Sequence, residues 1–511
     1  MSIVLAGCGE SVPLPFVPTP EPTPEQPRTL VVTVTQRGSG EPVPDARVSG
    51  AGVEARTAAD GSVQVSALRG TDLEISADDH DPATLSVPDE GDAAVELRRN
   101  VVRGVVTDAA GDPVAGARVF LEGAAHAVRT DRRGRYAVPD VPDEGTLIVK
   151  MPGFRLVEVP LGGEMDIDVA LEPFETRALY APGLVFEGPG RLQELLRLIE
   201  RTEANAVVID VKETGGWLYY ETDLPEAVES GAAARPIFEL EELLPALKER
   251  GIYTIARMVC MKDNTVGASR PELAVRNSAS GGPWRDNIGG IWLDPAAPGV
   301  AEYLAAIAGD LADKGFDEVQ LDYIRFFSDG PYDVADTNLP NSQSFRLPAI
   351  RRTLRVISER LATERAFLSA DVFPISFIVP DDQGIGQRPE VIMPYVDYFS
   401  PMVYPSHYGP GVFGHPVPNR APYDVIDKTL EIMNRQAAGL PMRIRPWIQD
   451  FGYGPFPPYT AAQIRDEMRA AADNGAVGWM IWNAQARFTE AALGDPRPDE
   501  DAGSVVLEPS G

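Results

Sequence analysis

The chain has very little cysteine and histidine for its length. Of 511 residues, only Cys8 and Cys260 are cysteines and only four are histidines. Two cysteines exclude a framework of several intrachain disulfides and a zinc site built from several thiolates. The histidines also lack the i, i+4 spacing of a helical zinc motif. The sequence therefore predicts no metal site and no cofactor.

Positive charge is also scarce. The formal net charge is −30, the isoelectric point is near 4.5, and only six of the 46 basic residues are lysines. Nucleic-acid binding normally needs a basic patch, so we expect no nucleic-acid partner. The acidic excess indicates a soluble surface, and the lysine shortage fits either a salt-adapted or a GC-rich source.

Long apolar runs are absent as well. No stretch approaches the roughly 20 residues that a membrane-spanning helix needs. A hydrophobic content of 44% with 24% charged residues is typical of globular proteins, and 511 residues suggest two to four domains. Neither a phosphate-binding glycine loop nor a G-x-S-x-G nucleophile motif is present, so carboxylates are the remaining candidates for chemistry.

The N-terminus, residues 1–28, carries a short motif before a Pro-rich tether. Leu5-Ala6-Gly7-Cys8 resembles the lipobox of bacterial lipoproteins, in which cleavage before the cysteine leaves it to carry a lipid. Only a stub of the usual apolar segment precedes it. We expect an exported protein on the cell surface or the periplasmic side of the membrane, held by a lipid on Cys8. The alternative is that the export signal is absent.

Residues 29–99 and 100–173 form an internal repeat. The segment Pro42 to Val48 corresponds to Pro113 to Val119, and each copy closes on an alternating apolar strand. Short strands separated by Asp, Gly and Pro turns indicate small antiparallel sandwiches. Both copies resemble the carboxypeptidase regulatory-like module, a transthyretin-type sandwich, although the first copy is degenerate at its opening. Such modules imply spacers or weak binding modules without catalytic groups.

From residue 177 to 495 the pattern changes to strands alternating with amphipathic helices, and residues 496–511 form an acidic tail. Eight such strands predict a TIM (β/α)₈ barrel, with a doubly wound sheet as the rival. The expected strands are 178–186, 206–212, 253–261, 318–326, 367–373, 398–404, 443–449 and 478–483. The expected helices are 190–202, 240–250, 301–314, 348–364, 388–395, 423–438 and 461–474.

Polar side chains gather where these strands end. A packed core would not tolerate them unless they faced a cavity, and in TIM barrels the carboxyl ends of the strands carry the active site. Carboxylates, amides and aromatic rings together suit a sugar, which has flat apolar faces ringed by hydroxyls. The predicted substrate-binding residues are Asp210, Lys212, Arg257, Tyr323, Arg325, Tyr404, Trp447, Gln449, Asp450, Trp482 and Asn483.

The same region resembles a family of bacterial putative glycosyl hydrolase barrels found in secreted and lipid-anchored proteins. The resemblance rests on segments such as Val208 to Lys212, Phe316 to Phe326, Ser369 to Phe373 and Gly478 to Asn483. One departure follows strand 2, where the family usually has Asp-Asp or Asp-Asn-Ser-Gly and this chain has Glu213-Thr214-Gly215-Gly216.

The resemblance implies a glycosidase that uses two aspartates at the barrel mouth. In many barrels that act on α-linked sugars an Asp ending strand 4 is the nucleophile, which implies that role for Asp322. Asp371 is the first choice as acid/base, followed by Asp450 and Asp210. Each carboxylate could instead form a structural ion pair at the barrel rim.

The sequence thus predicts an O-glycosyl hydrolase acting on an extracellular or envelope polysaccharide of unassigned composition. The alternative is a glycan-binding or envelope scaffold protein without a working acid. Two carboxyl groups about 5 to 10 Å apart across a cleft favour the enzyme. Burial of Asp322 in a salt bridge with Arg325 or Lys212 favours the scaffold.

Overall fold

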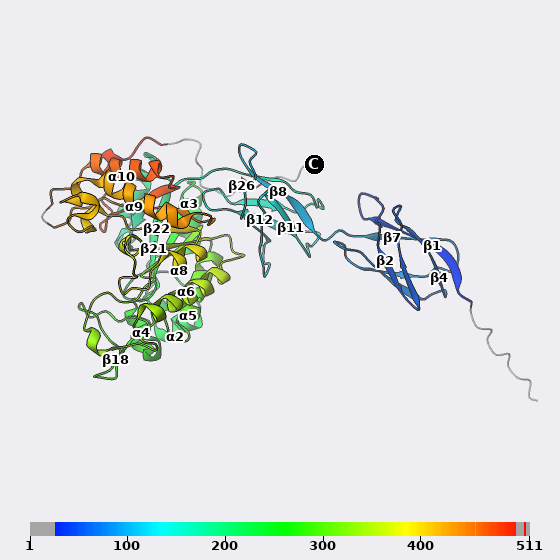
Figure 1. The fold of residues 1–511 in the computed structure, drawn as a ribbon, viewed down its shortest axis with the longest axis horizontal. Coiled ribbons are helices and arrows are strands. Elements are labelled where there is room, and N and C mark those ends of the chain that lie inside the picture. Colours follow the sequence, from blue (N-terminus) through cyan, green and yellow to red (C-terminus); the bar gives the residue numbers. More distant parts are fainter. Residues whose placement is uncertain (1–25, 455, 497–504, 507–511) are drawn as a thin grey trace, which may run out of the picture. The chain divides into compact units, whose positions relative to one another are not determined.

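The computed structural model describes residues 26–454, 456–496 and 505–506. The chain divides between Val101 and Val102 into two compact units. The first unit is a β-sandwich, and the second contains another sandwich followed by the barrel (Figure 1). The predicted multidomain fold is therefore confirmed. Cys8, most of the tether and most of the acidic tail lie outside the described residues.

The first sandwich packs a three-stranded sheet, in the order β4-β1-β7, on a four-stranded sheet in the order β3-β2-β5-β6. Alternate residues of the facing strands, such as Val32, Val34, Leu73 and Ile75, form its core, because side chains of a strand alternate between its two faces. The strands are β1 (Arg28–Gln36), β2 (Arg47–Gly50), β3 (Val53–Arg56), β4 (Ser62–Ala67), β5 (Asp72–Ser76), β6 (Ala83–Ser86) and β7 (Ala93–Leu97).

The second sandwich repeats this topology with sheet orders β11-β8-β14 and β10-β9-β12-β13, the latter extended by β26 (Val505–Val506). Thr57 and Thr130 make the same pair of hydrogen bonds, each donating to a carbonyl and accepting from a backbone N–H. The two modules are therefore structural repeats. The strands are β8 (Val102–Asp108), β9 (Arg118–Leu121), β10 (Val128–Arg129), β11 (Arg135–Val138), β12 (Thr146–Lys150), β13 (Val157–Pro160) and β14 (Val169–Leu171).

The barrel is a closed ring of parallel strands. Strand seven is split into β23 and β24, of which β23 pairs with β22 and β24 pairs with β25 to complete the ring. The strands are β15 (Thr176–Ala181), β16 (Ala206–Lys212), β17 (Tyr253–Val259), β19 (Glu318–Asp322), β21 (Phe367–Val372), β22 (Tyr398–Pro401), β23 (Arg443–Ile444), β24 (Trp447–Gln449) and β25 (Gly478–Trp482). A small hairpin outside the ring pairs β18 (Arg276–Asn277) with β20 (Ala335–Asp336).

Helices separate the strands and cover the outside of the ring (Figure 1). Outward-facing residues such as Val207, Leu321 and Leu368 pack with the helices in one large apolar cluster. The helices are α1 (Pro189–Glu200), α2 (Pro225–Ser230), α3 (Leu240–Lys248), α4 (Asn264–Ser269), α5 (Val300–Asp313), α6 (Gln343–Arg360), α7 (Ile375–Ile378), α8 (Pro389–Ile392), α9 (Pro422–Ala437) and α10 (Ala461–Asp473). Within the described chain, none has the length and apolar character needed to cross a bilayer.

The second sandwich packs on the N-terminal end of the barrel. Arg118 pairs with Asp397 at 2.5 Å, and the buried Lys150 ammonium donates to the carbonyls of Glu364 and Ala366 at 2.6 and 2.7 Å. Arg365 reaches back to two glutamates of the sandwich. A module expected to be a spacer is thus joined to the barrel by buried charges.

The first sandwich carries different residues at the matching positions. Arg118 faces Lys150 across β9 and β12, just as Arg47 faces Ser76 across β2 and β5. Arg47 is half exposed and pairs with the exposed Glu54. The same position of the fold therefore forms a buried contact with the barrel in the second sandwich and a solvent-exposed ion pair in the first.

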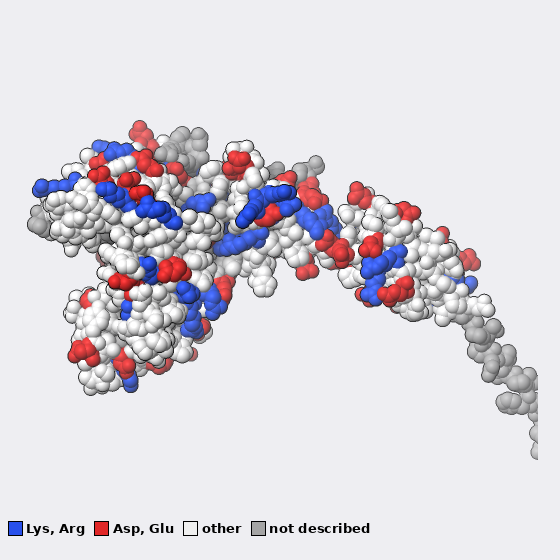
Figure 2. All heavy atoms as spheres, viewed as in Figure 1, with Lys and Arg blue, Asp and Glu red and all other residues white. Residues whose placement is uncertain are grey.

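Surface charge is mixed in sign despite the acidic total. On the face drawn in Figure 2, basic side chains are interspersed with acidic ones. Exposed pairs such as Arg355 with Glu359 and Arg201 with Glu490 contribute little to stability because solvent screens them.

Several predicted elements end earlier than expected. Strand β19 stops at Asp322 instead of continuing to residue 326, because Tyr323 has a left-handed φ of 51° that breaks the extended chain. The helix expected over 388–395 is one α-helical turn, α8, followed by a 3₁₀ turn, Met393–Tyr395.

Candidate active site

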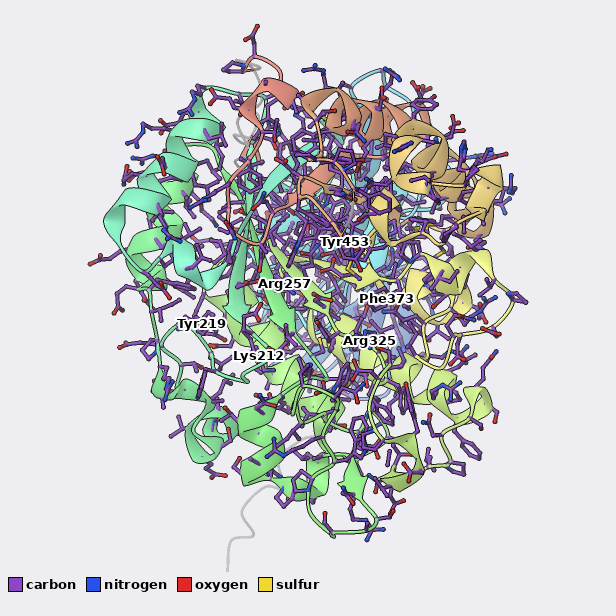
Figure 3. The ribbon with its side chains drawn as sticks, turned by 90° about the vertical axis from the view of Figure 1, so that its left-hand side faces the viewer. Lys212, Tyr219, Arg257, Arg325, Phe373 and Tyr453 are labelled. Atoms are coloured by element: carbon purple, nitrogen blue, oxygen red, sulfur yellow. The ribbon has the colours of Figure 1, made fainter. Side chains whose placement is uncertain are left out.

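The polar side chains of the strand ends converge inside the barrel mouth. Arg257 on β17 lies near the centre of the ring, with Arg325 and Phe373 on one side and Tyr219 on the other (Figure 3). The ring of parallel strands brings these residues together because all their carboxyl ends open at the same side.

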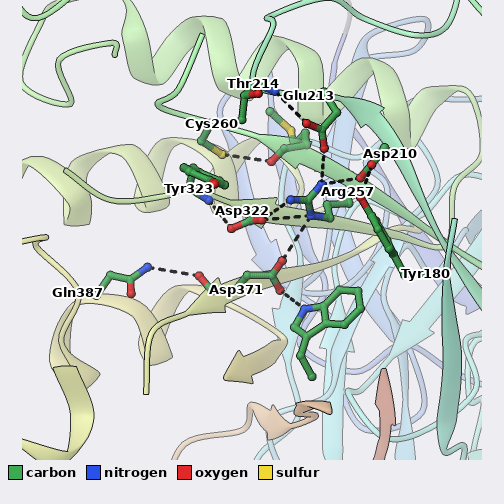
Figure 4. Close-up of polar contacts among 12 residues, drawn as sticks. Tyr180, Asp210, Glu213, Thr214, Arg257, Cys260, Asp322, Tyr323, Asp371 and Gln387 are labelled. Carbon is green, nitrogen blue, oxygen red and sulfur yellow. Dashed lines mark hydrogen bonds and ion pairs between the residues drawn. The ribbon is translucent and has the colours of Figure 1, made fainter. Parts of the chain in front are cut away.

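Arg257 is the hub of this site (Figure 4). Its Nη1 donates to Asp210 at 2.5 Å and to Glu213 at 3.0 Å. Its Nε donates to Asp322 at 3.1 Å, and its Nη2 donates to the same carboxylate. Asp371 Oδ2 lies 4.0 Å from Arg257 Nε. Four carboxyl groups thus surround one cation, and Asp322 pairs with Arg257 rather than with Arg325 or Lys212, the two partners that would favour the scaffold alternative.

Because several carboxyl groups share one cation, their pKa values shift in different directions. Burial raises the pKa of Asp371 well above its usual range, and the charge of Asp322 raises it further, whereas Arg257 lowers it. Burial likewise raises the pKa of Asp210 to about 7, against the attraction of Arg257. Burial also acts to raise the pKa of Glu213, but the charge and hydrogen bond of Arg257 outweigh it and the pKa is lowered.

Asp371 and Asp322 are held in different ways. Asp371 Oδ1 accepts a 2.7 Å hydrogen bond from the indole Nε1 of Trp447. Asp322 Oδ1 accepts from the backbone N–H of Tyr323 at 2.6 Å, while its Oδ2 takes Arg257. The distances to the shared Arg257 Nε limit the separation of the two Oδ2 atoms to about 7 Å.

Aromatic rings flank the carboxyl groups. Tyr180 stacks on Trp482 with ring centroids 4.0 Å apart, and Trp447 meets Trp482 edge-on. The Tyr180 hydroxyl donates to Asp210 Oδ2 at 2.5 Å, and the Arg257 guanidinium lies 5.2 Å from the Trp482 ring. These rings pack around the hub, and two of them, Trp447 and Trp482, line the cavity.

A cavity of about 390 Å³ opens over this cluster. It holds Asp322 and Asp371 together with all four predicted aromatic residues, and its size suits one or two sugar rings. The lining consists of Arg257, Asp322, Tyr323, Arg325, Asp371, Phe373, Pro374, Ile375, Met402, Tyr404, His407, Tyr408, Gly409, Val412, Trp447 and Trp482.

Five predicted site residues lie outside the lining. Asp210 stands behind Arg257, and Lys212 is fully buried in a 2.8 Å pair with Asp263. Gln449, also fully buried, accepts from the backbone N–H of Ser406 and so supports the loop that carries His407. These three therefore act on the site indirectly.

Asp450 and Asn483 lie beside a neighbouring hollow of about 390 Å³. Asp450 accepts from the backbone and hydroxyl of Thr489, and the Asn483 amide donates to the carbonyl of Asp450. Both side chains brace the loops after β24 and β25. With these partners, Asp450 is less suited than Asp371 to act as an acid.

Tyr323 stores backbone strain at the site. A non-glycine residue with φ of 51° costs about 1 kcal/mol or more relative to an extended residue. The turn places its N–H on Asp322 and its ring in the cavity wall. Strain of this kind clusters at functional sites.

Sequence reasoning missed Tyr180, Phe373 and the role of Glu213. Tyr180 is an inward residue of β15, two positions from the buried Ala178, so the period-two pattern could have identified it. Glu213 stands in the departure from the family pattern and supplies the third carboxylate on Arg257. In the described chain, no group of three or more His, Cys, Asp and Glu residues could hold a metal ion.

Comparisons with solved structures show several similar chains. One is a hypothetical protein from Ruminiclostridium thermocellum, 36% identical over 38% of this chain and 97% of that chain, with a TM-score of 0.35. Another is the PgaB (BpsB) glycoside hydrolase domain from Bordetella bronchiseptica, 14% identical over 63% and 99%, with a TM-score of 0.43. A chitinase from Chromobacterium violaceum is 15% identical over 62% and 98%, with a TM-score of 0.36.

No curated protein matches the chain. Residues 101–172 match the carboxypeptidase regulatory-like domain, which agrees with the second sandwich. Residues 178–488 match the family described as "Putative glycosyl hydrolase domain". That match covers more than half of the chain and all of the barrel strands from β16 to β25. The chain therefore belongs to this family of glycosyl hydrolase-like domains.

Proposed function

We propose that the protein is a glycoside hydrolase in which Asp371 is the general acid and Asp322 is the nucleophile or base. The observation that carries this proposal is a pair of neighbouring carboxyl groups in one cavity with different partners, Asp322 on the Arg257 guanidinium and Asp371 on the Trp447 indole. Burial and the charge of Asp322 raise the pKa of Asp371, and Arg257 supplies positive charge to Asp322. Glycosidases need one proton donor and one carboxylate.

The reaction would use the two groups on opposite sides of the scissile bond. Asp371 gives its proton to the glycosidic oxygen as the C1–O bond breaks. Asp322 either attacks C1 directly, and water later hydrolyses the resulting ester, or it removes a proton from a water that attacks C1. The limit of about 7 Å between the Oδ2 atoms admits the spacing of both retaining and inverting enzymes.

Asp210 and Glu213 have a supporting role in this proposal. They share Arg257 with Asp322, so they hold the guanidinium in the plane that meets the Asp322 carboxylate. Tyr180 and Trp482 fix Asp210 and present an aromatic face next to the cavity. Such a face can stack against a sugar ring.

A second candidate, a glycan-binding protein without catalysis, is favoured by one observation. Both oxygens of Asp322 already accept hydrogen bonds, one from Tyr323 and one from Arg257. A carboxylate so fully engaged is a weaker nucleophile. In that case the cavity would bind sugar through its rings and leave the bond intact.

The test is a screen of the full chain on α- and β-linked polysaccharides, both neutral and acidic, with release of reducing ends as the readout. Asp371→Asn and Asp322→Asn should remove activity. Asp286→Asn is the matched control, because Asp286 is also buried in an ion pair, with Lys262, but does not line the cavity. Sugar binding without hydrolysis by the wild type would favour the glycan-binding protein.

We also propose that the protein is exported and anchored by a lipid on Cys8, acting on an extracellular or envelope polysaccharide. The lipobox-like segment supports this. Cys8→Ser, in the natural host with the native upstream region, should move the protein from the membrane fraction to the soluble fraction. Unchanged fractionation would contradict the anchor.

A further inference from the structure

Arg325 is a buried cation in the wall of the candidate active site. The residue is 6% exposed and follows Asp322 by three positions, on the loop after β19. Both side chains line the same cavity. Whatever Arg325 binds would therefore lie next to the carboxyl groups.

Among the buried arginines of the described chain, Arg325 is the exception in its partners. Each of the others forms an ion pair with a carboxylate, whereas Arg325 forms none. The others are Arg118, Arg155, Arg177, Arg257, Arg346 and Arg445. Asp322 and Asp329 attract Arg325, but neither forms an ion pair with it. Because a buried charge without a direct counterion is costly, this exception calls for a partner from outside the chain.

The hydrogen bonds of Arg325 use only one of its nitrogens. Nη1 donates to the carbonyl of Phe326 at 2.9 Å and to Ser328 Oγ at 3.2 Å. No acceptor within the described residues takes Nε or Nη2. These two nitrogens form the edge of a guanidinium that binds a carboxylate through two parallel hydrogen bonds.

Three rings hold that edge in place. The guanidinium carbon lies 4.9 Å from the Trp292 centroid, 4.9 Å from Tyr323 and 4.8 Å from Phe373. The rings restrict the side chain to one orientation and exclude water from its faces, which strengthens an electrostatic contact there. Burial lowers the pKa of Arg325, so a bound anion would relieve a real penalty.

We propose that Arg325 makes the site selective for an acidic sugar residue, a uronate, whose carboxylate binds the Nε and Nη2 edge. The proposal rests on the proposed function and names its substrate class. A sugar held this way would place its ring between the aromatic wall and Asp371, which lines the same cavity. Sulfate and phosphate esters share the anionic chemistry and can also present two oxygens to a guanidinium, so a sulfated sugar is the comparison that tests the carboxylate assignment.

The overall charge of −30 does not oppose this selectivity at close range. Fields of exposed charges are screened within about 8 Å at physiological ionic strength. Inside the cavity, Asp322 pairs with Arg257, which it shares with Asp210 and Glu213, and burial raises the pKa of Asp371, which favours its neutral form. Arg325 is the second cation of the cavity lining and forms no ion pair within the described residues, so its guanidinium can take the carboxylate of a ligand.

The experiment measures binding of single sugars to the full chain by calorimetry, without turnover. The probes are glucuronate, galacturonate, glucose, galactose and glucose 6-sulfate. We expect at least one uronate to bind about tenfold more tightly than its neutral counterpart. Arg325→Gln should abolish the difference and Arg325→Lys should retain part of it. Tyr408→Phe, which changes the cavity wall but no charge, should leave the preference intact.

Several outcomes would overturn the proposal: equal affinity for charged and neutral sugars, a preference that survives Arg325→Gln, or no binding of any uronate. Tighter binding of glucose 6-sulfate than of both uronates would overturn the carboxylate assignment. Because the readout is binding, a chain that proves inactive can still show the preference. Conversely, hydrolysis of neutral glycans without charge preference would sink this inference and leave the proposed function standing.

Discussion

The two ends of the barrel interior each contain a buried arginine, but the arginines have very different partners. At the mouth, Arg257 is shared by Asp210, Glu213 and Asp322 and borders a cavity. At the base, Arg445 pairs with Glu318 alone and lies against the ring of Tyr398 at 4.3 Å, fully enclosed. Burial of charge is common to both ends. The surplus of carboxyl groups and the open cavity distinguish the site from the scaffold.

The difference follows from what each cluster can do with a proton. One cation facing one carboxylate is stable in a single protonation state. One cation facing four carboxyl groups cannot hold them all ionised, so at least one acquires a raised pKa, as Asp371 and Asp210 do. The cluster at the mouth is therefore suited to proton transfer, whereas the ion pair at the base contributes to stability.

The largest expected effect is on turnover at the mouth. Asp371→Asn should lower kcat by about 10²- to 10⁴-fold, because it removes the proton donor. Since the buried carboxyl group costs stability when ionised, the variant should be at least as stable as the wild type at neutral pH. The measurements are kcat and the urea midpoint. A variant that loses stability in step with activity would place Asp371 in the scaffold.

A substitution at the base should instead lower stability and leave activity nearly unchanged. Glu318→Gln leaves Arg445 buried without a counterion and should lower the free energy of unfolding by about 3 to 5 kcal/mol. The kcat/KM of the folded fraction should stay within about twofold of wild type, because Glu318 lies at the start of β19, away from the cavity. Urea unfolding and kinetics on the same sample decide it. A large drop in kcat/KM with normal stability would remove the distinction between the ends.

The sandwich interface extends the base, and the internal repeat supplies its control. Arg118→Met should cost about 3 kcal/mol, because Asp397 is left without its cation. Arg47→Met, at the matching position of the first copy, should cost less than about 1 kcal/mol since its pair is exposed. Thermal unfolding of both variants makes the comparison. Equal effects would mean that the second sandwich is held to the barrel by other contacts.

The smallest expected effect is a change in the pH dependence of the free energy of unfolding, caused by a substitution at the mouth. The pKa of Asp210 is about 7 when folded and near 3.9 when unfolded, so its contribution to stability is present below pH ~4 and is lost as pH rises toward 7. Asp210→Asn removes this titration. The wild type should therefore lose stability relative to the variant between pH 4.5 and 8, as measured by urea unfolding.

Asp286→Asn is the control for this profile. Burial acts to raise the pKa of Asp286, but its bonds to Lys262 and Trp292 prevail and lower it. Its contribution is lost only as pH falls below about 4, so its difference from wild type should be constant between pH 4.5 and 8. A flat profile for Asp210→Asn as well would show that Asp210 does not titrate in this range.

Much of the fold could be predicted from the sequence because its signals are local. Strand and helix periodicity gave eight strands in order, and the rule that parallel strands open at one side brought Asp322, Asp371 and Arg257 together. The end of β19 could not be predicted, because a tyrosine does not by itself indicate a positive φ. The cation for Asp322 was also missed, since pairing across strands depends on the tilt of the barrel.

The sandwich interface was out of reach for another reason. Arg118 and Asp397 are 279 residues apart, and the repeat motif that contains Arg118 does not indicate a partner in the barrel. Arg325 is similar: its sequence neighbours suggest an ion pair with Asp322, whereas Asp322 pairs with Arg257 from another strand. Long-range partners decide which charges are structural and which are available to a ligand.

The matching positions of the two sandwiches also carry an evolutionary consequence. A duplicated module starts with two identical faces, and here the residue opposite the arginine that both copies share differs, Ser76 in one copy and Lys150 in the other. Recruitment of a neighbour by one copy thus needs few substitutions and no change of fold. It also constrains that copy, because Arg118 and Lys150 can now vary only together with the barrel, whereas Arg47 and Ser76 are free to drift.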